Sequence, residues 1–289
     1  MRGDPLPTTP FGNRGPEVTR VGLGGEGVLR TRRREEEARG VIRAALDQGI
    51  TYFDSARVYA DSERYYGSVW SLQPEARARV FQASKSASRD REGARRDLEG
   101  TLARMGIETL DLWQIHDVRT QADLDLIAGP GGALEAFLEA RDTGKALHIG
   151  VTGHHDPAVL SHAVSRWPVD AVMMPVNPAE AVLGGFLDDT LPRARDRGLA
   201  VIGMKILGGG NYVRPEAGLT AGRLVRFALA RGVTVAIVGC SSPAEVEELA
   251  LAGSIPEAMP PEEQEAIVDA FRPSARRLAF YRKPGGVGP

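Results

Sequence analysis

The chain has 289 residues, of which 42% are hydrophobic and 26% are charged, and its net charge at pH 7 is −2. This length and apolar fraction suffice for one large core, while a nearly balanced charge without a basic tail argues against nucleic acid as a partner. With no apolar run of about 18 residues, no signal peptide and Cys240 as the sole cysteine, the sequence predicts a cytoplasmic protein without disulfides or membrane spans.

The first 18 residues are polar and rich in glycine and proline, and they predict an irregular lead-in that ends in a small hairpin around residues 12–16. Beyond them, short apolar runs alternate with segments of helical period. The predicted strands are residues 19–24, 50–54, 80–83, 110–115, 146–151, 171–175, 199–204 and 233–238. The predicted helices are residues 35–48, 62–70, 91–105, 132–143, 156–166, 186–197, 220–230 and 242–252. A loop at 118–130, an extra helix at 261–271 and an irregular tail at 273–289 complete the pattern.

Strict alternation of strands and helices predicts a parallel sheet covered by helices. Eight strand–helix units in about 250 residues have the size of a (β/α)₈ barrel, so we expect a single α/β TIM-barrel domain over residues 19–272. A doubly wound nucleotide-binding sheet is the competing fold. Its glycine fingerprint is missing, because residues 22–27 have the wrong glycine spacing and residues 30–34 separate them from the next helix.

Four polar residues fall at or just after the ends of three successive predicted strands. Asp54 ends the second strand and Tyr59 follows it, while Lys85 and His116 mark the ends of the third and fourth strands. The chain has only four lysines, so one kept at a strand end indicates a need for a compact ammonium group. Because the carboxyl ends of barrel strands meet at one rim, we expect these side chains to converge there.

The four residue types together suit proton transfer. A tyrosine phenol has a pKa of about 10 and is a poor acid at neutral pH, but a neighbouring ammonium stabilises the phenolate and lowers that pKa. A carboxylate holds the ammonium in place, and a histidine can donate a hydrogen bond to a substrate oxygen. Singly, each residue also fits an ordinary role: a rim ion pair for Asp54 and Lys85, a surface ring for Tyr59, a loop cap for His116.

The Asp-x4-Tyr pattern, the lysine and the histidine resemble the catalytic tetrad of the aldo-keto reductases. Neighbouring segments are similar too: Gly49–Ala56, Ser62–Glu63 with Tyr66–Gly67, and Leu98–His116. The resemblance covers roughly residues 15–255. It implies a barrel that binds NADP(H), with NAD(H) as the alternative, and needs no metal. Hydride would pass between the cofactor and a carbonyl carbon while Tyr59 gives the oxygen a proton.

The resemblance also implies where the cofactor lies. The loop at residues 205–210 matches the segment that wraps the pyrophosphate, and its glycines can expose backbone N–H donors, although simple turn chemistry would explain them too. Residues 239–242 match the adenosine phosphate site, where a helix N-terminus suits an anion. The cofactor-binding residues implied are Gly24, Asp54, Thr152, Asn177, Lys205, Ile206, Leu207, Gly208, Gly239, Cys240, Ser241, Ser242, Glu247 and Glu248.

The sequence departs from the family pattern at several of these positions. Thr152-Gly153 replaces the usual Ser-Asn pair, Val176 stands where an aromatic usually stacks on the nicotinamide, and Met173 replaces a glutamine. No lysine or arginine lies between residues 239 and 252 to pair with a 2′-phosphate, so a weak preference for NADPH is expected. We interpret His154 and His155 as a solvated loop pair rather than substrate contacts.

The sequence therefore predicts an NAD(P)H-dependent oxidoreductase that reduces small aldehydes or ketones, or runs the reverse reaction. The alternative is a barrel that binds the cofactor as a sensor or assembly subunit with little turnover. A metal-dependent hydrolase is disfavoured, because the lone Cys240 and the scattered histidines give no ligand set. The substrate, the direction and the oligomeric state are left open.

Overall fold

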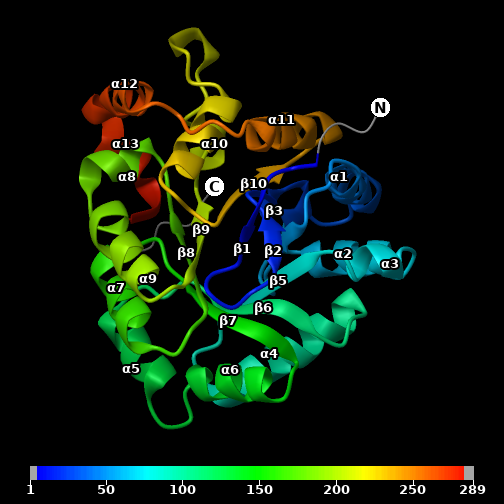
Figure 1. Ribbon diagram of the computed structural model, residues 1–289. Helices are drawn as coiled ribbons and strands as arrows, with labels where there is room; N and C mark the ends of the chain where they lie inside the picture. The colour runs from blue at the N-terminus through cyan, green and yellow to red at the C-terminus, as the bar shows by residue number, and fades with distance from the viewer. Residues whose placement is uncertain (1–4, 283–289) are drawn as a thin grey trace.

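Eight parallel strands close into a barrel in the computed structural model, which describes residues 5–282 (Figure 1). The spatial order is β10-β3-β4-β5-β6-β7-β8-β9, and β10 pairs with both β3 and β9 to close the ring. The strands are β3 (Val21–Gly27), β4 (Tyr52–Asp54), β5 (Phe81–Ser86), β6 (Leu110–Ile115), β7 (Ala146–Thr152), β8 (Ala171–Pro175), β9 (Ala200–Met204) and β10 (Val235–Cys240). The predicted (β/α)₈ barrel is confirmed.

A ring of helices surrounds the barrel (Figure 1). The helices that follow successive strands are α1 (Glu35–Asp47), α2 (Ser62–Trp70), α4 (Arg91–Met105), α6 (Ala133–Asp142), α7 (Pro157–Arg166), α9 (Leu191–Asp196), α10 (Ala221–Ala230) and α11 (Pro243–Ser254). Further helices are α3 (Pro74–Arg77), α5 (Gln121–Ala128), α8 (Pro178–Leu183), α12 (Pro261–Phe271) and α13 (Ala275–Leu278).

Two predicted stretches differ from the structure. The predicted loop 118–130 contains α5, which begins with a capping box between Thr120 and Asp123. The predicted helix 186–197 is divided into a π-helical turn, Phe186–Thr190, and α9. Gly184 and Gly185, both with positive φ, separate that turn from α8. Both differences result from local capping and from the backbone geometry of glycine, which hydrophobic periodicity does not reveal.

The barrel interior is filled by side chains that alternate along the strands. Its core contains Tyr52, Phe81, Ala83, Leu112, Ala171, Met173, Ala200, Ile202, Val235 and Ile237, together with Phe11 and Val18 from the N-terminal segment. Because successive side chains of a strand face opposite sides, residues two positions further along face the same interior. The inward face of β4, β5 and β6 therefore leads from this apolar core to Asp54, Lys85 and Gln114.

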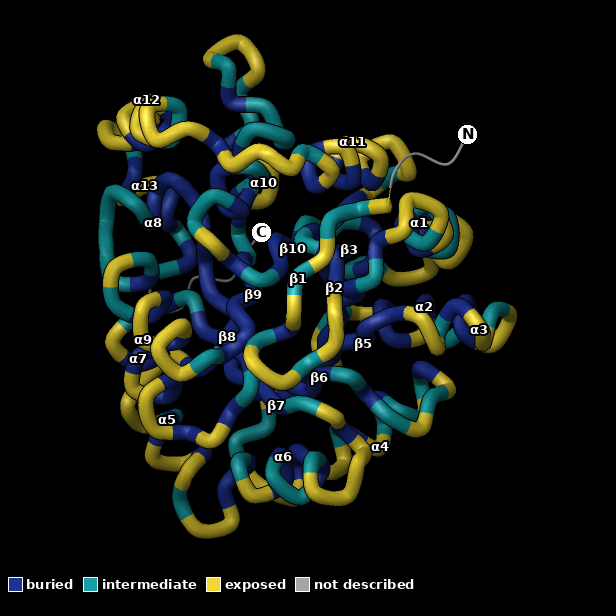
Figure 2. Tube along the Cα trace, viewed as in Figure 1, coloured by how far each residue is buried: buried dark blue, intermediate teal, exposed yellow. Residues whose placement is uncertain are grey.

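The N-terminal segment contains the hairpin predicted around residues 12–16, and it is more ordered than an irregular lead-in. Strands β1 (Thr8–Pro10) and β2 (Glu17–Thr19) pair antiparallel, and Phe11 at the turn is 2% exposed. Its ring lies 4.4 Å from that of Phe81 and 5.7 Å from that of His148. Figure 2 shows the partly exposed hairpin crossing in front of the buried barrel strands. Phe11 thus covers the amino-terminal end of the barrel core, opposite the end where Asp54 and Lys85 lie.

The C-terminal segment is likewise not an irregular tail over its described part. After α12, residues 272–282 form α13 and two 3₁₀ turns, Arg272–Ser274 and Phe280–Arg282. The Tyr281 hydroxyl donates to Glu180 (2.7 Å), and Arg282 pairs with the same carboxylate. Burial raises the pKa of Glu180, and Arg282 opposes the shift. Residues 283–289 of the predicted tail lie outside the described residues.

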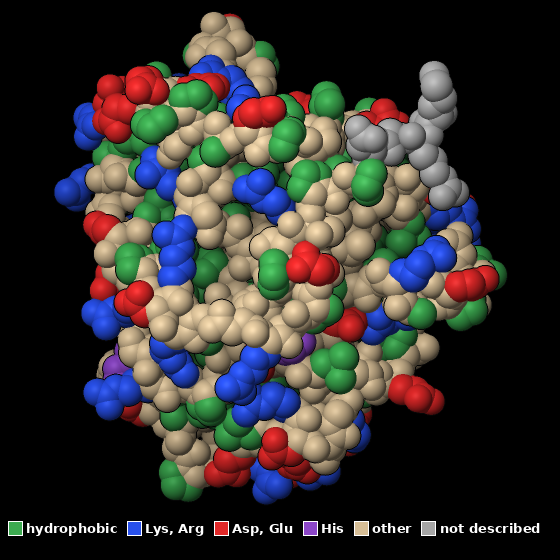
Figure 3. Space-filling model, viewed as in Figure 1, with side chains coloured by type: hydrophobic (Ala, Val, Ile, Leu, Met, Phe, Trp, Pro, Cys, Tyr) green, Lys and Arg blue, Asp and Glu red, His purple; other side chains and the backbone are tan. Residues whose placement is uncertain are grey.

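Basic and acidic side chains are interspersed over the face shown in Figure 3, in keeping with the net charge of −2. Among residues 5–282, no helix is long and apolar enough to cross a membrane.

Candidate active site

The three predicted strand-end residues come from neighbouring strands of the closed barrel. Asp54 on β4 is in register with Ala83 on β5, and Lys85 lies one inward position beyond Ala83. Lys85 is in register with Gln114 on β6, and His116 follows that strand. All three therefore lie at the carboxyl end of the barrel, which is where barrel enzymes carry their active sites.

Asp54 and Lys85 form a buried ion pair. The Lys85 Nζ lies 2.5 Å from Asp54 Oδ2 and also donates to the Ser55 carbonyl at 2.7 Å. Their side chains are 2% and 0% exposed. Burial lowers the pKa of Lys85 and raises the pKa of Asp54, and each charge opposes the shift of the other. Two of the three ammonium donors are thus engaged, which leaves one for the side on which Tyr59 lies.

Tyr59 lies over this pair. The Lys85 Nζ is 4.8 Å from the centre of the half-buried Tyr59 ring, and the His116 ring approaches it edge-on with centroids 5.6 Å apart. The guanidinium of Arg30 lies 5.1 Å from the same ring. Gly25 provides the space, because a Cβ there would lie 2.6 Å from the Tyr59 ring. The four predicted residues therefore meet at one place.

The pKa of Tyr59 does not follow the sequence-based expectation. It is raised well above its ordinary value, first by burial and then by the charges of Asp54 and Glu26, while Arg30 opposes the shift. The expected net lowering of this pKa is wrong for this structure, because burial raises it. The phenol is therefore protonated at neutral pH and has a proton to give, and the phenolate that remains needs the nearby ammonium group.

His116 is held as a neutral ring. Burial lowers its pKa well below the ordinary value, and the charge of Lys85 adds to the effect. Its buried Nδ1 has no hydrogen-bond partner. Arg89 fixes the backbone at this strand end, donating to the carbonyls of His116 (2.8 Å) and Asp117 (2.6 Å). A neutral imidazole still donates one hydrogen bond, so His116 can contact a substrate oxygen.

The segment around Ser62–Gly67 supports the ion pair from behind. The Tyr66 hydroxyl donates to the Asp54 carbonyl (3.2 Å), and Ser55 donates to Ser62 (2.9 Å). The buried Glu63 accepts from Ser84 (2.8 Å), the residue before Lys85, and pairs with Arg104 on α4. These contacts hold α2 against the ends of β4 and β5. They explain structurally why Ser62, Glu63 and Tyr66 lie beside the ion pair.

Comparison with known proteins establishes the family to which this chain belongs. The sequence model of the aldo/keto reductase family matches residues 20–218. The chain belongs to the aldo/keto reductase family. Members of this family are oxidoreductases that use nicotinamide cofactors.

Individual relatives agree with this assignment. The 6-dehydroglucose reductase of Novosphingobium aromaticivorans is 26% identical over 259 residues, which cover 82% of this chain and 82% of that protein. The aldo-keto reductase yakc of Schizosaccharomyces pombe, whose name includes NADP(+), is 27% identical over 189 residues, 60% of this chain and 53% of its own. A solved aldo-keto reductase of Bacillus halodurans in its holo form matches 96% of this chain and 100% of its own, with a TM-score of 0.76 and 18% identity, and supports the fold.

The loop after β9 carries several residues with positive φ. Lys205 has a left-handed backbone (φ 56°), and Gly208, Gly209 and Gly210 also have positive φ. A Cβ at Gly210 would meet nothing within 4 Å, so the backbone there is open to a ligand. The Lys205 ammonium lies 4.0 Å from Glu26 on β3, two strands away around the barrel. Ile206 in this loop is buried and Leu207 is half-buried.

The start of α11 is arranged differently from the expectation for a phosphate site. The Ser241 N–H donates to the Glu245 carboxylate (2.7 Å), and the Ser242 hydroxyl accepts from the Glu245 N–H (3.4 Å). Both groups expected to bind the adenosine phosphate are therefore engaged by Glu245. Glu247 and Glu248 lie exposed further along the helix.

Other residues expected to bind the cofactor have structural partners. Thr152 Oγ1 accepts from the Asp117 N–H (2.7 Å). The buried Asn177 donates to the Lys205 carbonyl (3.1 Å) and the Tyr281 hydroxyl (2.8 Å) and caps α8, so its amide is fully engaged within the protein. Gly24 and Gly239 lie back to back, since a Cβ at Gly24 would lie 2.9 Å from the Gly239 nitrogen. Burial raises the pKa of the Cys240 thiol to about 12.

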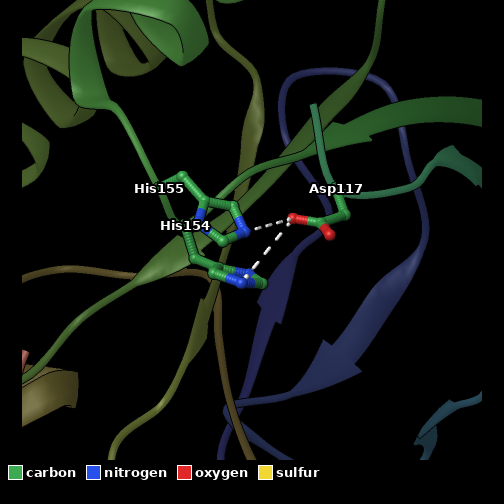
Figure 4. A group of neighbouring side chains, drawn as sticks. All are labelled: Asp117, His154 and His155. Atoms are coloured by element: carbon green, nitrogen blue, oxygen red, sulfur yellow. Dashed lines mark ion pairs between the residues drawn. The ribbon is translucent and has the colours of Figure 1, made fainter. Parts of the chain in front are cut away.

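His154 and His155 are not the solvated pair that the sequence suggested. Both rings point to Asp117 from the loop after β7 (Figure 4). The Asp117 Oδ1 lies 3.6 Å from His154 Nε2 and 3.3 Å from His155 Nε2. Burial lowers the pKa of His154 to about 3, so that ring is neutral at pH 7. The two histidines are therefore not scattered, because the loops after β6 and β7 bring them together with Asp117.

Sequence reasoning missed Gly25, Arg30, Arg89 and Asp117. Asp117 directly follows His116, and its φ of 57° is unusual for a residue other than glycine. The two adjacent histidines after a strand end were a signal for this cluster, but their partner lies 37 residues away in the sequence. Arg30 ends a short 3₁₀ turn, Val28–Arg30, and Arg89 lies in a loop, so the sequence spacing of both carries no information about their contacts.

Proposed function

We propose that this chain reduces aldehydes or ketones to alcohols, or catalyses the reverse oxidation, with NADP(H) or NAD(H) as the hydride partner. The observation that carries the proposal is the position of Tyr59 above the buried Asp54–Lys85 pair, with His116 against its ring. A reduced nicotinamide, bound along the mouth by the loop after β9, would supply the hydride.

The residues of the chain perform the proton half of this reaction. Tyr59 donates its proton to the carbonyl oxygen as negative charge develops there. Lys85 stabilises the phenolate that remains, and Asp54 holds the ammonium charged and in place at 2.5 Å. His116 donates a hydrogen bond to the same oxygen from a buried ring. Because the Lys85–Asp54 pair is almost fully buried, water does not weaken these interactions.

The test is Tyr59→Phe, with Tyr52→Phe as the matched control. Cofactor oxidation is followed with a panel of aldehydes and ketones that includes oxidised sugars, because a relative is named as a 6-dehydroglucose reductase. We expect Tyr59→Phe to lower turnover by about 10²–10⁴-fold and to leave the cofactor dissociation constant unchanged. Tyr52, whose buried hydroxyl has no partner in the barrel core, should tolerate the change.

Two outcomes oppose the proposal. Turnover of Tyr59→Phe close to that of the unaltered enzyme would remove this hydroxyl from the mechanism. Tight cofactor binding by the unaltered protein, with no oxidation by any carbonyl in the panel, would support the sensor or assembly role instead.

We further propose that NADPH is preferred over NADH only modestly. Glu245 places a carboxylate at the start of α11 where a 2′-phosphate would need a cation, and no lysine or arginine lies between residues 239 and 252. Glu245→Gln should strengthen NADPH binding severalfold and leave NADH unchanged, whereas Glu257→Gln, on the exposed segment after α11, should change neither. Fluorescence titration measures both dissociation constants. A preference for NADPH beyond about 100-fold, roughly 2.7 kcal/mol, would contradict this proposal.

A further inference from the structure

The cluster of Asp117, His154 and His155 lies beside the proposed catalytic residues but takes no part in the proton chemistry. One ligand-type atom from each residue lies within 4.8 Å of the other two. The side chains are 16%, 18% and 5% exposed, so the cluster is largely buried yet reachable through His154. Two imidazoles and a carboxylate are the ligand types that zinc and related divalent transition metals bind.

The spacing within the cluster matches that of ligand atoms around a metal ion. Asp117 Oδ1 and His155 Nε2 are both buried and lack a hydrogen-bond partner, although they lie only 3.3 Å apart. Bonds of about 2.0–2.2 Å around a tetrahedral zinc put neighbouring ligand atoms about 3.3–3.6 Å apart. The two distances from Asp117 Oδ1, 3.3 and 3.6 Å, equal this spacing. The two imidazole nitrogens are brought to it by rotation about χ2, which is soft for histidine.

The backbone on both sides of the cluster is held in place. The Asp117 N–H donates to Thr152, and Arg89 binds the Asp117 carbonyl. Asp156 directly after the histidines caps α7 through the Ala158 N–H (2.8 Å). Arg119 occupies the other carboxylate oxygen, Oδ2, at 2.5 Å and leaves Oδ1 to the histidines. The ligands are therefore preorganised, and the nearby cations Arg119 and Lys205 oppose the binding of a further cation.

We propose that Asp117, His154 and His155 bind one divalent transition-metal ion of the zinc class. The ion joins the loops after β6 and β7 and is not required for hydride transfer. The proposal does not depend on the reductase activity, and its readout is metal binding. Treatment with a chelator should therefore remove the ion and leave carbonyl reduction intact.

The experiment uses the full-length protein without a histidine tag. Equilibrium dialysis against Zn²⁺ is expected to give one bound ion per chain. Titration with Co²⁺ is expected to produce the visible absorption of a four- or five-coordinate site with nitrogen ligands. His155→Gln and His154→Gln should each weaken binding by at least about tenfold, since changes beyond the direct ligands alone cost 10–100-fold. His162→Gln, on the exposed face of α7, is the control and should bind like the unaltered chain.

The outcomes decide the proposal in both directions. A loss confined to the His154 and His155 variants supports it. No stoichiometric binding by the unaltered chain, or equal binding by His155→Gln and the unaltered chain, overturns it, and a proton or a water molecule then fills the gap between Asp117 and His155. Asp117→Asn is a third variant, and if it fails to fold, the histidine variants still decide the question.

Discussion

Gly25 shows how closely the fold is shaped around a single side chain. It lies on β3, and a Cβ there would approach the Tyr59 ring to 2.6 Å. Gly25→Ala should displace the ring while the barrel remains folded. Since a misplacement of about 1 Å costs on the order of 10²-fold in rate, we expect kcat/KM for carbonyl reduction to fall by about 10–100-fold.

Far-UV circular dichroism and the melting temperature establish that the Gly25→Ala variant is folded. Gly40→Ala is the control at this scale, because a Cβ on Gly40 meets nothing within 4 Å. Unchanged kcat/KM in Gly25→Ala would mean that the position of the Tyr59 ring does not limit the reaction.

At the scale of single residues, the sequence identified candidate catalytic residues where a polar side chain lies at the end of a predicted strand. Asp54, Lys85 and His116 were identified because a polar residue ends each apolar run, and the barrel brings such ends together. Loop residues gave no comparable signal. Arg30 over Tyr59 and Asp117 facing two histidines depend on how loops from different units meet, which neither spacing nor period encodes. For the same reason the pKa of Tyr59 was misjudged, because burial of a loop side chain is a tertiary property.

Among the elements, the contact between α2 and α4 depends on Gly67. A Cβ there would lie 2.2 Å from the Arg104 carbonyl oxygen, a backbone atom that cannot move alone. Gly67→Ala should force the helices apart and destabilise the protein by about 1–3 kcal/mol or more. The same change at Gly40 on α1, where the space is open, should stabilise it by about 0.4–1 kcal/mol.

Urea unfolding followed by fluorescence measures both free energies, so the two alanine variants form a matched pair. Because α2 also holds the Asp54 carbonyl through Tyr66, Gly67→Ala is expected to lose activity as well as stability. Equal effects at Gly67 and Gly40 would show that helix propensity, not packing, sets the outcome.

The barrel strands and the long helices could be predicted from hydrophobic periodicity and from the alternation of strands and helices. The short helices could not. Helix α5 depends on the capping box of Thr120 with Asp123, and α13 packs against α8. The N-terminal hairpin was predicted around residues 12–16, but the burial of Phe11 at its turn was not. Only the barrel end gives Phe11 an apolar surface to cover, and that surface is assembled from strands far along the chain.

At the scale of the whole molecule, the two ends of the barrel are separate in role. Phe11 closes the amino-terminal end, and the proposed site lies at the other. Phe11→Ala should lower the free energy of unfolding by about 3–5 kcal/mol and leave KM and kcat unchanged below the melting temperature. Leu126→Ala, at a residue that is 61% exposed on α5, should change stability by less than about 0.5 kcal/mol. A loss of activity without loss of stability in Phe11→Ala would contradict this separation.

Docking of the N-terminal hairpin also sets an order of events during synthesis on the ribosome. The Asn13 N–H donates to the Gly198 carbonyl, just before β9, and Phe11 packs in a core that includes Ala200 and Val235. The N-terminal hairpin can contact Tyr52 and Phe81 early, but its docking site is complete only when β9 and β10 have emerged. Contacts of such large sequence separation form late and slow folding. Until β9 and β10 have been synthesised, the barrel cannot close, and the edges of β3 and β8 have no neighbouring strand. Such exposed strand edges are sites that a chaperone would bind.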